Sequence, residues 1–190
     1  MRVLIDACVL YPTVMRELVL GVARKGLFAP RWSARILEEW ARAAAKLGPA
    51  QEVVARGEIV TVQAAFPGAE VPVPDTAERQ FWLPDAADRH VLAAAVLGSC
   101  DAIMTLNAKD FPRNVLQEEG LLRVDPDTFL RGLWEADPGA VSQVAEGVLA
   151  EARRLSGDDW TIRALMKKAR LPRLGKALVS GGAGGAVRSA

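Results

Sequence analysis

The sequence predicts an α/β fold, and three apolar runs together with the segments between them lead to that prediction. The runs are residues 2–8, 102–106 and 121–124, each short and rich in Val, Leu or Ile. Such runs are typical of strands that are buried on both faces in the middle of a parallel sheet. Segments of helical length separate them, so we expect a three-layer α/β/α architecture with a central parallel sheet.

Apolar spacing and stop signals mark the helices around these strands. The expected helices cover residues 12–25, 33–47, 50–66 and 84–97, and another begins at residue 126. Ser33 is suited to an N-cap, whereas residues 59–62 also read as strand. Residues 28–32 form a short connection or a brief strand. Residues 71–74 suit an extended edge segment, because proline cannot donate within a sheet.

Composition excludes several kinds of site. His90 is the only histidine, which excludes a multi-histidine metal site and argues against a Ser-His-Asp triad. Cys8 and Cys100 lack the spacing of zinc or redox motifs, so any metal here is a hard cation held by oxygen. No apolar run approaches the ~20 residues that span a bilayer, and the chain starts without a cleavable signal pattern. We therefore expect a cytoplasmic protein with no membrane association.

Carboxylates recur at the predicted strand ends and on the predicted helices. Asp6 ends the first strand, where α/β proteins bind ligands, although it could instead cap the turn before the next helix. Glu38 and Glu39 lie on the helix that begins near residue 33. Their alternative role is surface charge paired with Arg35 or Arg42.

A second set of polar groups follows later in the chain. Asp85 and Asp88 are three residues apart and share a helix face, although Asp85 could act only as a cap. Thr105, Asn107 and Asp110 belong to a polar turn after a strand, which turn chemistry alone could explain. Several carboxylates in one pocket repel each other unless they are protonated or bridged by a divalent metal. Oxygen ligands select Mg²⁺ or Mn²⁺, which activates water and stabilises the charge on a phosphodiester under attack.

Four segments, taken in order, resemble a known family. They are residues 4–6 (LID), 36–40 (ILEEW), 85–95 (DAADRHVLAAA) and 100–112 (CDAIMTLNAKDFP). Together they resemble a PIN domain over about residues 1–130, and more narrowly the toxin ribonucleases of VapBC toxin–antitoxin pairs. The resemblance implies a PIN-like fold in which Asp6, Glu39 and Asp88 are the catalytic, metal-binding carboxylates. Glu39 fits better than Glu38, because Glu39 directly precedes the aromatic Trp40.

The resemblance also implies supporting roles around those carboxylates. Asp85 would be an outer ligand, Thr105 would orient the pocket, and Asp110 would be a turn residue. Asn107 stands where the family often has another acid, which leaves the fourth ligand open. Its amide oxygen could bind a metal or a metal-bound water. His90 is expected to be structural, with contact to substrate or phosphate as the alternative.

Members of the family use Mg²⁺ or Mn²⁺ to cleave RNA, usually as homodimers that a cognate antitoxin silences. The resemblance therefore predicts a Mg²⁺/Mn²⁺-dependent endoribonuclease, the toxin of a type II toxin–antitoxin pair. One alternative is a degenerate PIN module that binds RNA or a partner protein without cleavage, which Asn107 favours. Another is a metal-dependent DNA nuclease or a phosphatase. A phosphatase with Asp6 as nucleophile would have a second aspartate where Cys8 stands.

The C-terminal part departs from the family pattern. We expect a nuclease domain over residues 1–135, a helical extension over residues 136–180 and a flexible tail over residues 181–190. Residues 141–155 and 160–169 are the expected helices of the extension. The end of the second helix and the residues after it are basic and free of acidic residues, with Lys167, Lys168, Arg170 and Arg173. These side chains form either a solvated face or a contact to the RNA backbone.

Overall fold

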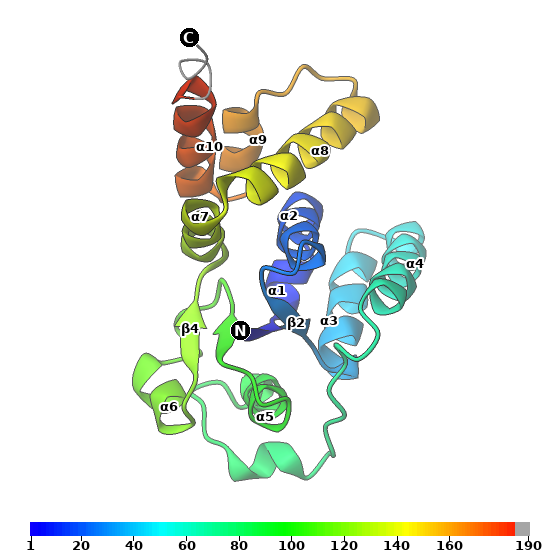
Figure 1. Cartoon of the computed structure of the whole chain (residues 1–190). Helices are drawn as coiled ribbons and strands as arrows, with labels where there is room; N and C mark the ends of the chain where they lie inside the picture. Colours follow the sequence, from blue (N-terminus) through cyan, green and yellow to red (C-terminus); the bar gives the residue numbers. More distant parts are fainter. Residues whose placement is uncertain (185–190) are drawn as a thin grey trace. The chain divides into compact units, whose positions relative to one another are not determined.

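Four short strands form a parallel sheet in the computed structural model of the chain, which describes residues 1–184 and side chains up to residue 181 (Figure 1). The strands are β1 (Arg2–Ile5), β2 (Ala29–Arg31), β3 (Ala102–Met104) and β4 (Leu122–Val124), in the order β2-β1-β3-β4. All three strand pairs are parallel, and Leu4 is aligned with Arg31 on one side and Ile103 on the other. Helices flank the sheet, so the predicted α/β class is confirmed.

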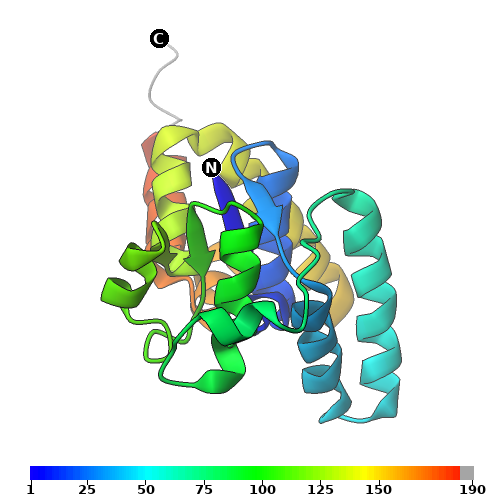
Figure 2. The ribbon, with the colours of Figure 1, turned by 90° about the horizontal axis from the view of Figure 1, so that it is seen from below.

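The chain divides into two compact units. Unit 1 comprises residues 1–11 and 28–124 and contains the whole sheet. Its helices are α1 (Ala7–Leu10), α3 (Ala34–Ala45), α4 (Pro49–Ala65), α5 (Arg89–Leu97) and α6 (Arg113–Glu118), with 3₁₀ turns η1 (Ala77–Gln80) and η2 (Ala86–Asp88). Helix α5 packs on β1 and β3, while α3 and α4 form a helical hairpin that Figure 2 shows side by side.

Local signals account for most of the boundaries in unit 1. The Ser33 hydroxyl accepts a hydrogen bond from the Ile36 N–H at 3.3 Å, as expected for the N-cap of α3. The predicted helix over residues 84–97 begins as η2, because the Asp85 carboxylate accepts a hydrogen bond from Ala87 and caps the 3₁₀ turn. The region of residues 59–62, which also read as strand, belongs to α4.

The predicted edge segment forms no strand, although one isolated bridge lies directly before it. Trp32 bridges Glu70 in parallel, with the Val71 N–H donating to the Trp32 carbonyl at 2.8 Å. Residues 71–74 are outside any strand. This follows from Pro72 and Pro74, which have no N–H to continue a ladder.

Unit 2 comprises residues 12–27 together with the chain from residue 125 onward, and its described part is helical. Its helices are α2 (Thr13–Arg24), α7 (Pro126–Ala136), α8 (Pro138–Ser156), α9 (Ile162–Lys168) and α10 (Pro172–Gly184). Unit 2 groups α2 and α7 with the helices of the predicted extension, while the division into a domain over residues 1–135 and an extension stays a prediction. Gly21 explains the grouping of α2: a Cβ there would lie 2.5 Å from Val144 Cγ1, so only glycine lets α2 approach α8 this closely.

Helix α10 extends the described fold into the predicted tail. The expected flexible segment begins at residue 181, whereas α10 continues to Gly184. A Cβ on Gly181 would lie 2.5 Å from Trp134 Cζ2, so this glycine is packed against a ring of α7. Residues 185–190 of the predicted tail lie outside the described residues. Within the described part of the chain, none of the helices is both long and apolar enough to cross a membrane.

Candidate metal centre

The strand order brings two carboxyl ends together in unit 1. The chain passes from β1 to β2 on one side and later to β3 on the other, so β1 and β3 flank a topological switch point. Ligands bind α/β sheets outside the carboxyl ends of the strands at such a point. Asp6 directly follows β1, and its N–H donates to the Met104 carbonyl of β3 at 3.1 Å. Thr105 directly follows β3.

Asp6 is held in place by two side chains. The Thr105 hydroxyl donates to Asp6 Oδ2 at 2.7 Å, and the Cys8 thiol donates to the same oxygen at 3.0 Å. Burial and the negative charge of Asp6 raise the pKa of Cys8 to about 12, so the thiol keeps the proton that it donates. Asp6 makes no side-chain cap to α1, so the alternative role as a helix cap is not realised.

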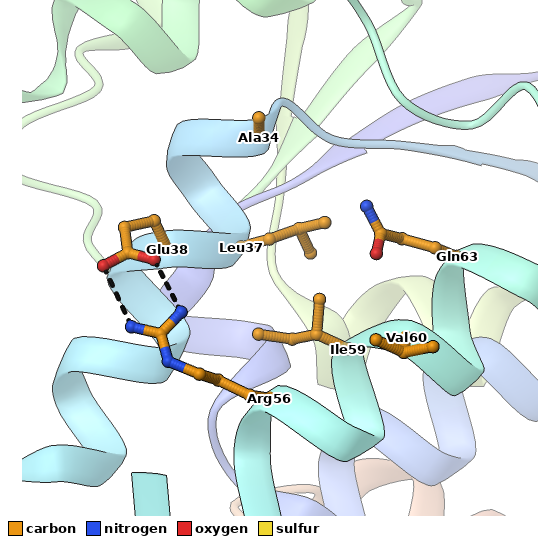
Figure 3. A pocket seen from close by; sticks show the side chains of 7 residues that line it. All are labelled: Ala34, Leu37, Glu38, Arg56, Ile59, Val60 and Gln63. Carbon is orange, nitrogen blue, oxygen red and sulfur yellow. Dashed lines mark hydrogen bonds and ion pairs between the residues drawn. The ribbon is translucent and has the colours of Figure 1, made fainter. Parts of the chain in front are cut away.

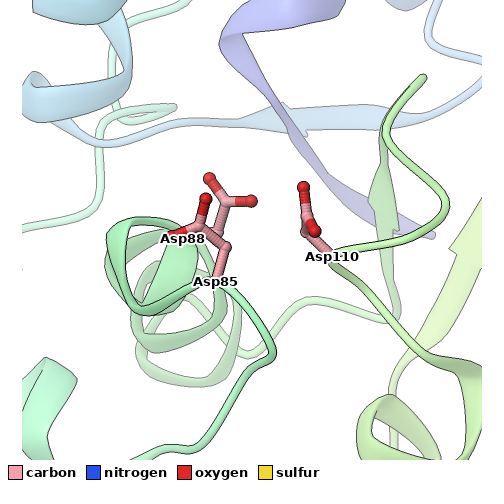
Figure 4. A group of neighbouring side chains, drawn as sticks. All are labelled: Asp85, Asp88 and Asp110. Atoms are coloured by element: carbon pink, nitrogen blue, oxygen red, sulfur yellow. The ribbon is translucent and has the colours of Figure 1, made fainter.

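Three further carboxylates of unit 1 lie close together. Oxygens of Asp85, Asp88 and Asp110 all lie within 4.8 Å of one another (Figure 4). Asp85 and Asp88 come from the turn that opens α5, and Asp110 faces them from the segment after β3. Asp88 is the N-cap residue of α5 but makes no side-chain cap, which leaves its carboxylate directed to the group. We call Asp85, Asp88 and Asp110 the aspartate group.

Electrostatics link the aspartate group to Asp6. Partial burial raises the pKa of Asp88 to about 6, and the negative charges of Asp6, Asp85 and Asp110 add to the shift. Ionising all four carboxylates without a counterion is therefore unfavourable. A divalent cation would remove this penalty, and the oxygen-only donors fit Mg²⁺ or Mn²⁺.

Asn107 connects the turn after β3 to the aspartate group. Its side-chain amide donates a hydrogen bond to Asp110 Oδ2, and its backbone N–H donates to Thr105 Oγ1 at 2.9 Å. Turn chemistry suggested only a turn role for Asp110, but the structure also brings its carboxylate to Asp85 and Asp88. No local pattern in the sequence indicates this meeting, because the two segments are distant along the chain.

Glu39 has different partners. Its Oε1 lies 2.8 Å from His90 Nε2 and 3.6 Å from Arg35 Nε, and Glu39 is not among the residues of the aspartate group. His90 is 3% exposed, and the close approach to Glu39 falls outside hydrogen-bond geometry, so it is a charge contact when the imidazole is protonated. The Glu39 side chain therefore extends from α3 to α5, the helix whose N-cap residue is Asp88.

Glu38 points to the other side of α3. It forms an ion pair with Arg42 at 3.0 Å. A second ion pair, with Arg56 of α4 at 2.9 Å, is drawn in Figure 3. Hydrogen bonds from these two arginines lower the pKa of Glu38. Glu38 therefore has the role of paired surface charge that was the alternative for both glutamates.

The basic residues expected to contact RNA lie in unit 2 and differ in their surroundings. Lys167 is exposed on α9, and Lys168 Nζ lies 4.6 Å from the centre of the Trp160 ring. Arg170 follows α9 with a φ of 62°. Arg173 donates from its guanidinium to Thr128 Oγ1 at 2.6 Å, so it is already engaged with α7.

The fold and the aspartate group define a parallel α/β protein with a candidate divalent-cation site. A family model described as "PIN domain" matches residues 2–109, which is more than half of the chain. The chain belongs to the PIN-domain family, whose members are generally metal-dependent nucleases. The matched span includes Asp6, Glu39 and Asp88 and ends one residue before Asp110. Comparisons with curated proteins and with solved structures gave no match.

Proposed function

We propose that the chain is a Mg²⁺- or Mn²⁺-dependent endoribonuclease and the toxin of a type II toxin–antitoxin pair. The observation that carries the nuclease part is the aspartate group next to Asp6, at the switch point of a PIN-domain sheet. The order of the four PIN-like segments supports the ribonuclease and toxin parts. A homodimer and a cognate antitoxin belong to the same proposal and rest on the same resemblance.

The proposed site gives each side chain a distinct role. Asp6 and Asp88 would hold the cation, with Asp85 and Asp110 completing the oxygen donors. Glu39 would join from α3 by leaving its contact with His90. The cation, when bound, lowers the pKa of a bound water and neutralises charge on the phosphate.

Hydrogen bonds from neighbouring residues hold the carboxylates in position. Thr105 and Cys8 hold one oxygen of Asp6 by hydrogen bonds, which leaves Oδ1 available to a ligand. Asn107 fixes Asp110 in the same way. Because the pKa of Asp88 is about 6, a proton that it holds in mildly acidic solution must leave when a cation binds.

The main alternative is a degenerate module that binds RNA or a partner without cleavage. Asn107 favoured it, because the family often has an acid at that position. The contact between Asn107 and Asp110 weakens this argument, since Asp110 supplies a carboxylate to the same turn. We therefore favour the active nuclease.

An RNA-cleavage assay tests the proposal. We expect the purified chain to cut a labelled single-stranded RNA in Mg²⁺ or Mn²⁺ and not in EDTA, and to leave DNA of the same base sequence intact. Glu38→Gln is the matched control, because it removes a carboxylate that lies outside the aspartate group. Binding without cleavage would support the degenerate module. Cleavage of the DNA would replace ribonuclease with a broader nuclease.

A further inference from the structure

The end of the described chain carries positive charge without acidic residues. From Trp160 onward the sequence contains no Asp or Glu. Its described basic residues are Arg163, Lys167, Lys168, Arg170, Arg173 and Lys176, and all six are exposed. The first four are on α9 or directly after it (Figure 1), and we call them the α9 cations. They lie outside the span that matches the PIN-domain family.

The α9 cations lack the ion pairs that other arginines of unit 2 make. Arg131 pairs with Glu135 at 2.6 Å, and Arg154 pairs with Glu151 at 2.7 Å. Among the described residues, no carboxylate forms an ion pair with any α9 cation. Arg163 and Lys167 are four residues apart, so they project from successive turns on one helix face. The surface therefore presents uncompensated positive charge.

Among the described residues, this surface exposes little apolar area beside the α9 cations. Leu165, Met166, Leu171 and Leu174 are at most 2% exposed. Ile162 and Trp160 are half-buried, and Lys168 Nζ lies 4.6 Å from the centre of the Trp160 ring. Protein–protein interfaces usually have an apolar core with aromatic or aliphatic anchors. Interfaces with nucleic acid are more polar and much more positively charged. The exposed chemistry therefore favours a polyphosphate over a protein partner.

Arg170 occupies a backbone position that suits glycine better. Its φ is 62°, and the Leu171 N–H donates to the Met166 carbonyl at 2.8 Å, which closes a Schellman turn after α9. A side chain in this left-handed conformation is strained. An arginine at this position therefore costs more fold stability than a glycine would, by roughly 1 kcal/mol.

We propose that the α9 cations bind the phosphate backbone of RNA. The identity of the nucleic acid rests on the proposed ribonuclease function, whereas the preference for a polyanion rests on the surface alone. Binding of this kind releases counterions and does not depend on base sequence.

Salt dependence tests the inference in the full chain carrying Asp6→Asn, which keeps the RNA probe intact. The probe is a labelled 20-nucleotide single-stranded RNA, measured at several NaCl concentrations. The test variant is Arg163→Gln/Lys167→Gln/Arg170→Gln. The control variant is Lys25→Gln/Arg131→Gln/Arg154→Gln, which removes three positive charges that already have partners in unit 2.

We expect the test variant to flatten the slope of log affinity against log salt by about 2, because each lost contact contributes about 0.7 for a single strand. Its affinity should fall tenfold or more at ~0.15 M salt by the same relation. The control should keep most of its slope and affinity. Unchanged slopes, or equal flattening in both variants, would overturn the inference.

Two more measurements separate the remaining outcomes. Arg170→Gly should raise the melting temperature and weaken RNA binding together; a variant that is more stable but binds RNA unchanged would contradict a role for Arg170. A 20-residue oligoglutamate serves as a second probe, and loss of its binding with RNA binding retained would replace RNA with an acidic protein. If RNA binds through these cations but wild-type protein never cuts it, the proposed function fails and this inference stands.

Discussion

The aspartate group of unit 1 and the α9 cations of unit 2 both gather like charges, but in different surroundings. The aspartates converge from two segments to within 4.8 Å; Asp88 and Asp110 are half-buried, and Asp85 is exposed. The cations point from an exposed helix toward solvent, and the described carboxylates leave them without ion pairs. The fold brings the three aspartates close together, whereas it leaves the α9 cations exposed on the surface.

The difference determines how each set binds its counter-charge. Close, partly buried carboxylates interact at short range with little screening, so a single divalent cation between them is the natural counter-charge. Exposed cations act through a field that salt screens within about 10 Å at 0.1 M, which suits an extended polyanion. Unit 1 is thus expected to respond to metal and pH, and unit 2 to ionic strength.

The largest effect is expected from Asp88→Asn, which keeps the shape of the side chain but removes its charge. We predict that cleavage in Mg²⁺ falls by more than 100-fold, since even residues that only support metal ligands cost about 10–100-fold. Initial cleavage rates against wild type at equal protein concentration measure this. Wild-type rates in the variant would show that Asp88 is not part of the metal site.

Substitutions of the adjacent glutamates of α3 are expected to give an effect of intermediate size on cleavage. Glu39→Gln should lower cleavage by about tenfold or more if Glu39 joins the cation, whereas Glu38→Gln should leave it within about twofold. The two positions are adjacent and undergo the same chemical change, so each controls for the other. The reverse result, with Glu38 essential and Glu39 dispensable, would mean that the paired surface charge is the functional one.

The smallest effect concerns the stability of the metal-free protein. Because folding raises the pKa of Asp88 from 3.8 to about 6, the folded state binds more protons than the unfolded state between these values. Stability from this group is present below pH ~3.8 and is lost as the pH rises through about 6. After allowance for solvent screening, the loss is about 1 kcal/mol.

Urea unfolding of wild type and Asp88→Asn at pH 4.5 and 7 measures that loss. The variant should gain stability relative to wild type at pH 7 and much less at pH 4.5. A larger gain at pH 4.5 would mean that Asp88 is stabilised, not penalised, as an anion in the folded protein.

The sequence predicted the strand ends better than it predicted the contacts between distant segments. Asp6 and Thr105 were predictable because parallel strands share a carboxyl edge, whichever helices surround them. The place of Asp110 in the aspartate group depends on the turn after β3 meeting the turn before α5, which no local pattern encodes. Turn composition therefore suggested only a local role for Asp110.

The extension shows the same limit. Helical periodicity located α2 but could not indicate that Gly21 fits against Val144 of α8. Glycine-rich composition indicated a flexible tail from residue 181, whereas Gly181 belongs to α10 and packs against Trp134 of α7. In both places a glycine permits two helices to approach closely. From the sequence alone, a glycine is usually interpreted as the end of a helix.

The most direct test of the account is crystallography of the protein with Mn²⁺, using anomalous scattering to locate the ion. We predict a peak between the carboxylates of Asp85, Asp88 and Asp110, within reach of Asp6 Oδ1, and no such peak in Asp88→Asn. A strong Mn²⁺ peak elsewhere, or none at the aspartate group at saturating Mn²⁺, would contradict the proposed metal centre.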